Sequence, residues 1–345
     1  MRLFGQVIQA GHSMDLEATG GKRARASRGI LAVDRLSALP DCLLHHIMSF
    51  MKARQVVQTC VLSTRWTHLW RSVLCLDVDQ EEFMAADVMG PNYKEELDKF
   101  DDFAANLMCR YNVALLDSFR LHIRPSMFSC PSEIPASAWI RRAIKYCRPD
   151  PGAPAVAYMV LSVSRFRGGV LLNRMPSLDK ASIRVWDNSA GLDQSKLAKD
   201  QLNLLDSVSN VTSLELSDFG TMVFGEESMT FPKFQNLRTL LLDNCDLSGN
   251  FQTVGNFLCN SPNLEMLTLR HCKFTKDYKK RKGQANVRKA FSSCRLNQMD
   301  FQCKNLKLTE IIIYEDDNVH KLVKLLLSIS RHLPRNNIKI TKADC

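Results

Sequence analysis

Apolar residues recur along most of the chain in one short pattern, apolar-x-x-apolar-x-apolar. Copies begin at Val73, Leu116, Tyr158, Leu178, Val211, Leu237, Leu264 and Leu308. Because alternate residues of a strand face opposite sides, the second and third apolar positions of each copy would point into a core. One copy cannot bury its apolar side, whereas stacked copies make a continuous core. The pattern therefore predicts a stack of short parallel strands.

Two copies carry a longer form of the pattern. Residues 237–247 and 264–274 both read apolar-x-x-apolar-x-apolar-x-x-Cys-x-apolar, which fits the leucine-rich-repeat template. In that template Cys245 and Cys272 occupy a turn position, which favours a structural role over a reactive thiol. The starting positions are 20 to 44 residues apart. Because the spacing is irregular, the alternative is an ordinary α/β domain whose strands merely share this apolar pattern.

Stretches with helical periodicity lie between several copies. They cover residues 95–112, 138–147, 195–208 and 254–260. Helices in these places would cover the other side of the strands, as in a repeat array. A further helix over residues 318–333 would protect the open edge beside the last copy.

A short helical segment precedes most of the repeats. The apolar residues of its three predicted helices are Leu43, Leu44, Ile47, Phe50 and Met51, then Val56, Val57, Cys60 and Val61, then Trp66, Leu69 and Trp70. Pro40 suits the first position of the first helix, where its missing N–H costs nothing. A unit of roughly 45 residues rarely supplies its own stability. The segment is therefore interpreted as an interaction module that docks onto another protein.

The same segment resembles the F-box of plant F-box/leucine-rich-repeat proteins. The resemblance rests on Leu39-Pro40-Asp41, Leu43-Leu44, Ile47, Thr59-Cys60-Val61-Leu62-Ser63, Arg65-Trp66 and Leu69-Trp70. The chain departs from the family at Cys42, where an acidic residue is common, and at Met51-Lys52, where Leu-Pro or Leu-Lys is usual. A three-helix piece buried within the chain is the alternative interpretation.

The resemblance implies binding to the Skp-family linker of a cullin-based ubiquitin ligase. The apolar docking face would then comprise Leu39, Pro40, Leu43, Leu44, Ile47, Val61, Leu62 and Trp66. The family joins an F-box to a leucine-rich-repeat horseshoe, with parallel strands on the concave side and helices on the convex side. Residues 301–326 also resemble the end of grass-type members. The expected fold is an α/β protein with an N-terminal three-helix F-box and an irregular horseshoe.

The expected domains are a disordered basic segment at 1–33, the F-box at 34–79 and the repeat domain at 80–345. The net charge of +10 is concentrated in two segments, since residues 22–28 carry +4 and residues 273–289 carry +7. We expect residues 273–289 to form a basic insertion in the repeat domain, with its charges solvated. Nucleic-acid binding by this insertion is a less favoured alternative, and such binding would weaken steeply with salt.

The sequence carries none of the common motifs of catalytic, cofactor or metal sites. The sequence has no Gly-rich phosphate loop, no G-x-S-x-G, no H-E-x-x-H and no C-x-x-C. No stretch approaches the roughly 20 apolar residues of a membrane span, and the N-terminus lacks a secretory core. The twelve cysteines are therefore expected to be thiols in the cytoplasm or nucleus. We expect no catalytic residue, cofactor or metal, and hence a non-enzymatic protein.

The expected function is substrate recognition in a Skp–cullin–F-box ubiquitin ligase, with the linker, the cullin and a protein target as partners. Outward strand positions form the candidate target surface: Glu215, Ser217, Leu241, Asp243, Thr268, Arg270, Ile312 and Tyr314. The assignment depends on register, because a one-residue slip exchanges inward and outward residues. A ligase-independent scaffold is a further alternative. The sequence does not identify the target, or any ligand or modification that recognition requires.

Overall fold

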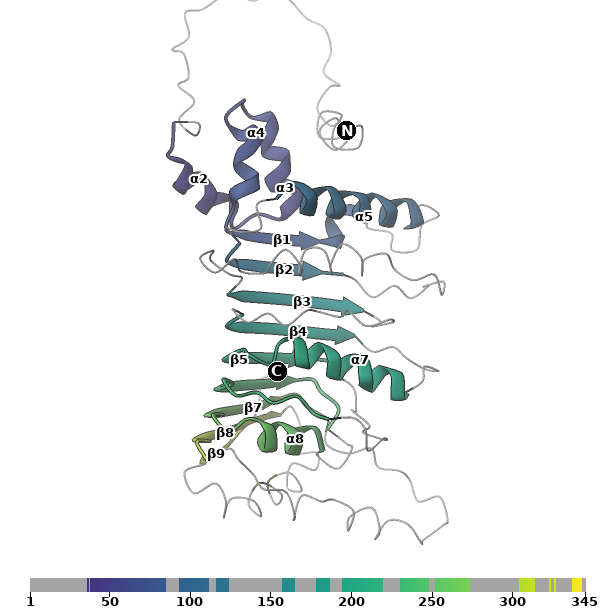
Figure 1. The fold of residues 1–345 in the computed structure, drawn as a ribbon, viewed down its shortest axis with the longest axis vertical. Helices are drawn as coiled ribbons and strands as arrows, with labels where there is room; N and C mark the ends of the chain where they lie inside the picture. Colours follow the sequence, from purple (N-terminus) through teal and green to yellow (C-terminus); the bar gives the residue numbers. More distant parts are fainter. Residues whose placement is uncertain are drawn as a thin grey trace, which may run out of the picture. The chain divides into compact units, whose positions relative to one another are not determined.

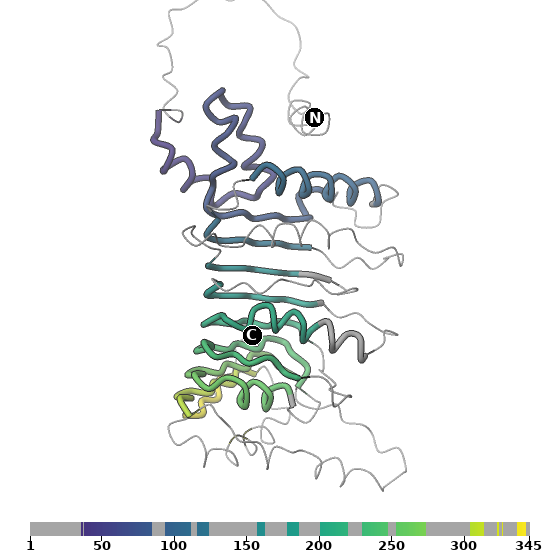
Figure 2. Tube along the Cα trace, in the orientation of Figure 1, coloured from purple at the N-terminus to yellow at the C-terminus, as the bar shows by residue number. Residues whose placement is uncertain are grey.

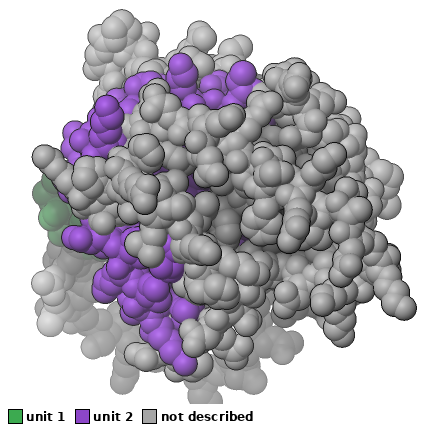
Figure 3. All heavy atoms as spheres, turned by 90° about the horizontal axis from the view of Figure 1, so that it is seen from below, with its two compact units in different colours: residues 1–120, 149–154 green, residues 121–148, 155–345 purple. Residues whose placement is uncertain are grey.

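The computed structural model describes much of the chain in two compact units. The described residues are 36, 38–84, 93–111, 116–123, 157–164, 178–186, 194–219, 230–247, 252–273, 304–313, 323, 326 and 337–342 (Figure 2). The first unit is residues 1–120 with 149–154, and the second is residues 121–148 with 155–345 (Figure 3). The predicted segment 1–33, the helix at 138–147, residues 274–289 and Tyr314 lie outside the described residues.

The first unit begins with short helices in the predicted module. They are α2 (Asp41–Met48), α3 (Ala53–Gln58), the 3-10 helix η1 (Thr59–Val61), α4 (Trp66–Leu69) and the 3-10 helix η2 (Trp70–Ser72) (Figure 1). Pro40 caps α2, and its carbonyl accepts hydrogen bonds from the N–H groups of Leu43 and Leu44 at 3.1 and 3.2 Å. The core of the module is formed by Leu44, Met48, Val56, Val57, Trp66 and Trp70.

The first unit continues into strands and a long helix. Its further elements are β1 (Cys75–Asp79), the 3-10 helix η3 (Gln80–Phe83), α5 (Tyr93–Arg110) and the start of β2 (Ser118–His122). Strand β1 adjoins β2, since the Leu74 carbonyl accepts from the N–H groups of Asp117 and Ser118. The apolar side of α5 is buried through Phe100, Phe103 and Leu107. The helix predicted at 95–112 is thus confirmed.

The second unit is built on a parallel sheet whose strand order follows the chain. The strands are β3 (Tyr158–Ser164), β4 (Lys180–Trp186), β5 (Ser213–Ser217), β6 (Thr239–Asp243), β7 (Met266–Arg270), β8 (Leu308–Ile313) and β9 (Asn337–Lys342). Helices α7 (Gln194–Ser207) and α8 (Gln252–Asn260) lie on the same side of these strands (Figure 1). The α/β class and the parallel strands are confirmed.

The inward positions of neighbouring strands lie in rows. Leu214, Leu240 and Leu267 are paired across β5, β6 and β7, and the next inward row is Leu216, Leu242 and Leu269. All six side chains are buried. Side chains in register can pack into one core, so the stacking inferred from the apolar pattern holds in this part of the chain.

Two predicted copies are displaced by two residues from the common register. Thr309 of β8 pairs with Leu267 and is fully buried, whereas the apolar pattern predicts a copy that starts at Leu308. The polar residue at this inward position hid the true start of the copy at Leu306. The copy at Tyr158 is also displaced by two residues, since Met159 and Leu161 pair with Ala181 and Ile183. A two-residue shift keeps each side chain on the same face, so the predicted faces remain correct.

The final strand was not predicted. Strand β9 pairs with β8 along Leu308 to Ile313, so the prediction that a helix protects this edge is wrong. Its sequence, NIKITK, has two apolar residues, Ile338 and Ile340, and Ile340 is exposed. Helical residues at 323 and 326 are described within the range predicted as a terminal helix.

Candidate protein-binding surfaces

An apolar surface is exposed on the helical module. Leu43 and Ile47 of α2 are 48% and 41% exposed, and Val61 and Leu62 are 58% and 56% exposed. Pro40 is also exposed, and Leu39 is half-buried. These residues of the predicted docking face are therefore accessible to a partner, and their binding role stays a prediction.

Two residues of the predicted docking face are part of the core. Leu44 is fully buried and Trp66 is 2% exposed. Leu43 and Leu44 are about 100° apart around the helix, so only one of them can point away when α2 packs against α4. The structure therefore restricts the accessible face to the other six residues, while Leu44 and Trp66 support it from inside.

An ion pair joins the start of α2 to the residue before α4. The carboxylate of Asp41 accepts hydrogen bonds from the Arg65 guanidinium, with Nε at 3.1 Å from Oδ1. The indole N–H of Trp70 donates to the Thr67 carbonyl at 3.1 Å. The Asp41–Arg65 pair therefore ties the start of α2 to α4, and the Trp70 bond is internal to the segment that contains α4.

A charged cluster links the helical module to β1. The Lys52 ammonium lies 3.2 Å from Asp77 Oδ1 and 3.0 Å from Asp79 Oδ2, and Arg120 Nη1 lies 3.8 Å from the other oxygen of Asp77. Asp77 is buried. Partial burial lowers the pKa of Lys52, but its hydrogen bond to Asp79 and attraction to Asp77 outweigh burial and raise it overall. Lys52 therefore neutralises buried charge at the base of the module.

A second contact joins α3 to η3. The backbone N–H of Arg54 donates to Glu82 Oε2 at 3.4 Å, and the Arg54 guanidinium lies 4.8 Å from the centre of the Phe83 ring. Burial raises the pKa of Glu82 to about 7, although Arg54 partly opposes the shift. Phe83 in turn packs against Phe100 and Phe103 of α5, with ring centres 5.5 and 5.0 Å apart.

The second unit places most of the predicted target residues on one face of its sheet. Glu215, Leu241, Thr268, Arg270 and Ile312 are half-buried at outward positions, as the register predicted. Ser217 and Asp243 are buried instead. Ser217 is a small side chain between the longer Arg184 and Asp243 in its row, and Asp243 is covered by Arg270 and His271. These two residues are therefore unsuited to contact a target directly.

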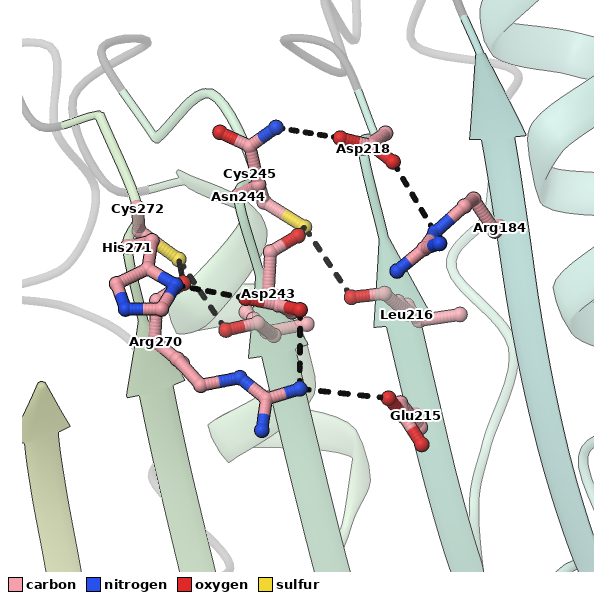
Figure 4. A network of polar contacts seen from close by, with 11 residues as sticks. Arg184, Glu215, Leu216, Asp218, Asp243, Asn244, Cys245, Arg270, His271 and Cys272 are labelled. Atoms are coloured by element: carbon pink, nitrogen blue, oxygen red, sulfur yellow. Dashed lines mark hydrogen bonds and ion pairs between the residues drawn. The ribbon is translucent and has the colours of Figure 1, made fainter.

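Polar contacts cross the carboxyl ends of β4 to β7. Arg270 Nη2 lies 2.9 Å from Asp243 Oδ2 and 3.6 Å from Glu215 Oε1, and His271 Nδ1 lies 3.4 Å from Asp243 Oδ1 (Figure 4). In the same region Arg184 Nε lies 3.2 Å from Asp218, which also accepts from the Asn244 amide. The outward surface thus carries arginines whose directions are held by neighbouring carboxylates.

The turns after three strands share one backbone conformation. Asp218, Asn244 and His271 have φ angles of 59°, 50° and 53°. Their N–H groups donate to the carbonyls of Asp243, Arg270 and Ile312 in the neighbouring strands, at 2.8 to 3.0 Å. Asp, Asn and His are the residues other than glycine that tolerate this region best. The Asn or His before each repeat cysteine therefore signals a left-handed turn, which the sequence analysis did not predict.

The two repeat cysteines close these turns. Cys245 Sγ lies 3.4 Å from the Leu216 carbonyl, and Cys272 Sγ lies 3.3 Å from the Leu242 carbonyl, each in the preceding strand. Interaction with Cys272 and burial raise the pKa of the Cys245 thiol. A protonated thiol can donate to a carbonyl, which agrees with the structural role inferred for both residues.

Neither a metal site nor a membrane span is found in the described part of the chain. Within it, no group of three or more His, Cys, Asp or Glu residues could hold a metal ion, and no helix is long and apolar enough to cross a bilayer. The described cysteines are free thiols.

Comparison with known proteins identifies the helical module. The F-box domain model matches residues 36–77. The meiotic F-box protein MOF of Oryza sativa subsp. japonica is 25% identical over 412 residues, which cover 90% of this chain and 86% of that protein. An F-box/LRR-repeat protein of Arabidopsis thaliana is 34% identical over 89 residues, or 26% of this chain and 18% of the relative. An FBD-associated F-box protein of the same plant is 50% identical over 50 residues, or 14% and 11%.

The matches differ in how much of each relative they cover. The chain spans most of the rice protein but less than a third of these two Arabidopsis proteins. Plant F-box proteins generally act as non-catalytic substrate adaptors, and an F-box implies binding to a Skp-type adaptor. On this evidence residues 36–77 form an F-box domain, and the chain is similar to plant F-box/leucine-rich-repeat and FBD-associated F-box proteins.

Proposed function

We propose that this chain is the substrate-recognition subunit of a Skp–cullin–F-box ubiquitin ligase. The observation that carries the proposal is the exposed apolar face of the F-box, formed by Leu43, Ile47, Val61 and Leu62 together with Leu39 and Pro40. Exposure of such apolar side chains to water is unfavourable, and exposed apolar patches commonly mark a binding surface. This face would bind the Skp-family linker and, through it, the cullin, in the cytoplasm or nucleus.

Target capture is assigned to the parallel sheet. We infer that β3 to β9 form the concave side of a leucine-rich-repeat horseshoe and that α7 and α8 belong to its convex side. The outward residues Glu215, Leu241, Thr268, Arg270 and Ile312 would contact the target. Leu241 and Ile312 are apolar residues on an otherwise polar face, as interface anchors often are.

The proposed mechanism is proximity. The F-box would join the ligase, the sheet would hold the target, and ubiquitin would be transferred by an enzyme elsewhere in the assembly. Holding the two reactants together raises their effective concentration without a catalytic side chain in the adaptor.

Linker binding is tested by replacing Leu43 and Ile47 together with alanine. Both side chains are exposed, so the variant should stay folded. We expect its affinity for a purified Skp-family linker to fall at least about tenfold, because anchors buried at an interface commonly contribute more than 1 kcal/mol each. The measurement is isothermal titration calorimetry, with the fold checked by circular dichroism.

A control distinguishes docking from stability. Leu74→Ala removes another exposed leucine of the first unit and should leave linker affinity unchanged. Equal binding by wild type and the double variant would contradict the proposed docking face. Absence of binding by well-folded wild type would contradict the proposed function itself.

Target binding is tested by Leu241→Asp on the outward face of β6. A carboxylate at this half-buried position should disturb an apolar contact, and it adds negative charge beside Glu215 in register. We expect the amount of ubiquitylated protein that co-purifies with the chain to fall about tenfold, with linker binding unchanged. The control is Arg238→Ala, on the exposed amino-terminal rim of the sheet. Equal losses of ubiquitylated protein in both variants would contradict the assignment of the target to this face.

A further inference from the structure

Two arginines on the outward face of the second unit are each paired with a carboxylate that is less exposed. Arg184 is 44% exposed, whereas Asp218 is 15% exposed, and Nε lies 3.2 Å from Oδ2. Arg270 is 37% exposed, whereas Asp243 is 12% exposed, and Nη2 lies 2.9 Å from Oδ2. A partner that approaches these pairs therefore meets the guanidinium groups before the carboxylates.

The two arginines lie in one row across the sheet. Arg184 of β4 and Arg270 of β7 are connected in register through Ser217 and Asp243. Neighbouring strands are about 4.8 Å apart, so the two backbone positions are about 14 Å apart. Both side chains lean toward the strands between them, β5 and β6 (Figure 4). An extended segment that crosses these two strands would contact both guanidinium groups.

Glu215 is the most exposed carboxylate of this network. Its side chain is 36% exposed, and Oε1 lies 3.6 Å from Arg270 Nη2, which is longer than a hydrogen bond. Exposed ion pairs contribute little free energy, so a carboxylate from a partner can replace Glu215 beside Arg270 at small cost. Asp243 is buried and would keep the guanidinium in place during this exchange.

Apolar side chains stand next to the charged ones on this face. Leu241 is in register with Glu215, and Ile312 is in register with Arg270. A bound polypeptide that covered these apolar groups would exclude water, and charge interactions strengthen where water is excluded. The combination of guanidinium groups with apolar neighbours suits a segment that carries both acidic and apolar side chains.

We propose that this face recognises an acidic segment of the protein target, whose Asp or Glu carboxylates bind Arg184 and Arg270 and displace Glu215 from Arg270. The inference rests on the proposed function and names the chemistry of its target. The occupant is assigned from charge complementarity, because in both ion pairs the cation is the exposed member. Glu215 is then an internal competitor of the target.

The test measures the binding of two fluorescein-labelled peptides to the full-length chain by fluorescence anisotropy. One peptide alternates Glu with Leu, and the other alternates Lys with Leu. Arg184→Gln and Arg270→Gln should each weaken binding of the Glu peptide about tenfold, because each removes a hydrogen bond to a charged group. Glu215→Gln should strengthen this binding about threefold, because it removes an exposed competing charge.

A charge-matched control lies on the amino-terminal rim of the same sheet. Arg238 Nη1 lies 2.9 Å from Glu265 Oε1, so Arg238→Gln also removes one cation and one ion pair. This variant should bind the Glu peptide like wild type. Equal changes in all variants, Arg238→Gln included, would reduce the effect to net charge and overturn the inference.

Other results would assign a different occupant. Tighter binding of the Lys peptide, weakened by Glu215→Gln, would show that the face prefers a basic segment. A single-stranded DNA oligonucleotide that binds more tightly than the Glu peptide and depends on Arg184 and Arg270 would assign the face to nucleic acid. Either result, or no binding of the Glu peptide, would overturn the inference.

Linker binding separates this inference from the proposed function. Wild type that binds a purified Skp-family linker in isothermal titration calorimetry, but shows none of the expected differences between peptides and variants, would overturn the inference and leave the proposed function standing. Wild type that does not bind the linker would contradict the proposed function, whatever the peptides show. Circular dichroism checks that each variant is folded.

Discussion

Replacement of Trp66 by alanine is expected to lower the free energy of unfolding of the first unit by about 3–5 kcal/mol. The side chain is 2% exposed in α4, and its loss would leave a large cavity in a module with few core residues. The surrounding elements are short helices, which can collapse only partly into such a space. The measurement is urea unfolding followed by circular dichroism.

Leu62→Ala is the matched control for Trp66→Ala. Leu62 is exposed in the same module, so its truncation should change the unfolding free energy by no more than about 0.5 kcal/mol. The resemblance placed both residues on the docking face, whereas the structure separates them into core and surface. Unchanged stability in Trp66→Ala together with lost linker binding would contradict this separation.

Replacement of Lys52 by methionine is expected to lower the free energy of unfolding by about 2–4 kcal/mol, since it removes the nearest cation from a buried carboxylate and partial exposure of Lys52 reduces the full penalty. Asp77 is buried, and Arg120 is the more distant cation at 3.8 Å. The unfolding free energy of both proteins would be measured over a range of pH. Because folding raises the pKa of Lys52, its stabilisation should be complete below pH 10.5 and be lost as the pH rises through the folded-state pKa.

A surface ion pair supplies the control for Lys52. Lys99 lies 2.8 Å from Glu95 on α5, and both side chains are more than half exposed. Exposed pairs of this spacing contribute about 0.3–0.5 kcal/mol, so Lys99→Met should have a small effect. Equal effects of the two substitutions would show that the Lys52 cluster is solvated and does not hold the module to β1.

The Lys52 cluster and the Arg54–Glu82 contact explain why the first compact unit contains more than the F-box helices. The family model ends at residue 77, within β1, whereas the unit continues through α5 to Arg120. The acidic partners of Lys52 and Arg54 lie in β1 and η3. A shortened F-box that ends before these residues would lose the charges that compensate its own basic side chains.

Repeated polar contacts also join successive strands of the second unit. At the start of the strands, the Asn236 amide donates to the Asn210 carbonyl at 3.3 Å, and the Asn263 amide donates to the Gln235 carbonyl at 2.7 Å. Each of these asparagines precedes the first apolar residue of a copy. Together with Cys245 and Cys272 at the other end, they hydrogen-bond to backbone carbonyls of the preceding repeat.

Sequence alone determined where the strands and the F-box helices lie, because apolar periodicity is a local property that survives in any packing. It located β1 to β8 and the apolar face of α2, and it missed β9, whose edge position requires few apolar residues.

Tertiary structure decided which apolar residues are buried. Leu43 and Leu44 are equally apolar, but packing against α4 buries Leu44 and leaves Leu43 exposed. Likewise, Asp243 occupies an outward position and is buried because Arg270 of the next strand and His271 of the turn after it cover its carboxylate. Burial depends on neighbours distant in sequence, so a local pattern could predict the faces of strands and helices but not which of their residues remain accessible.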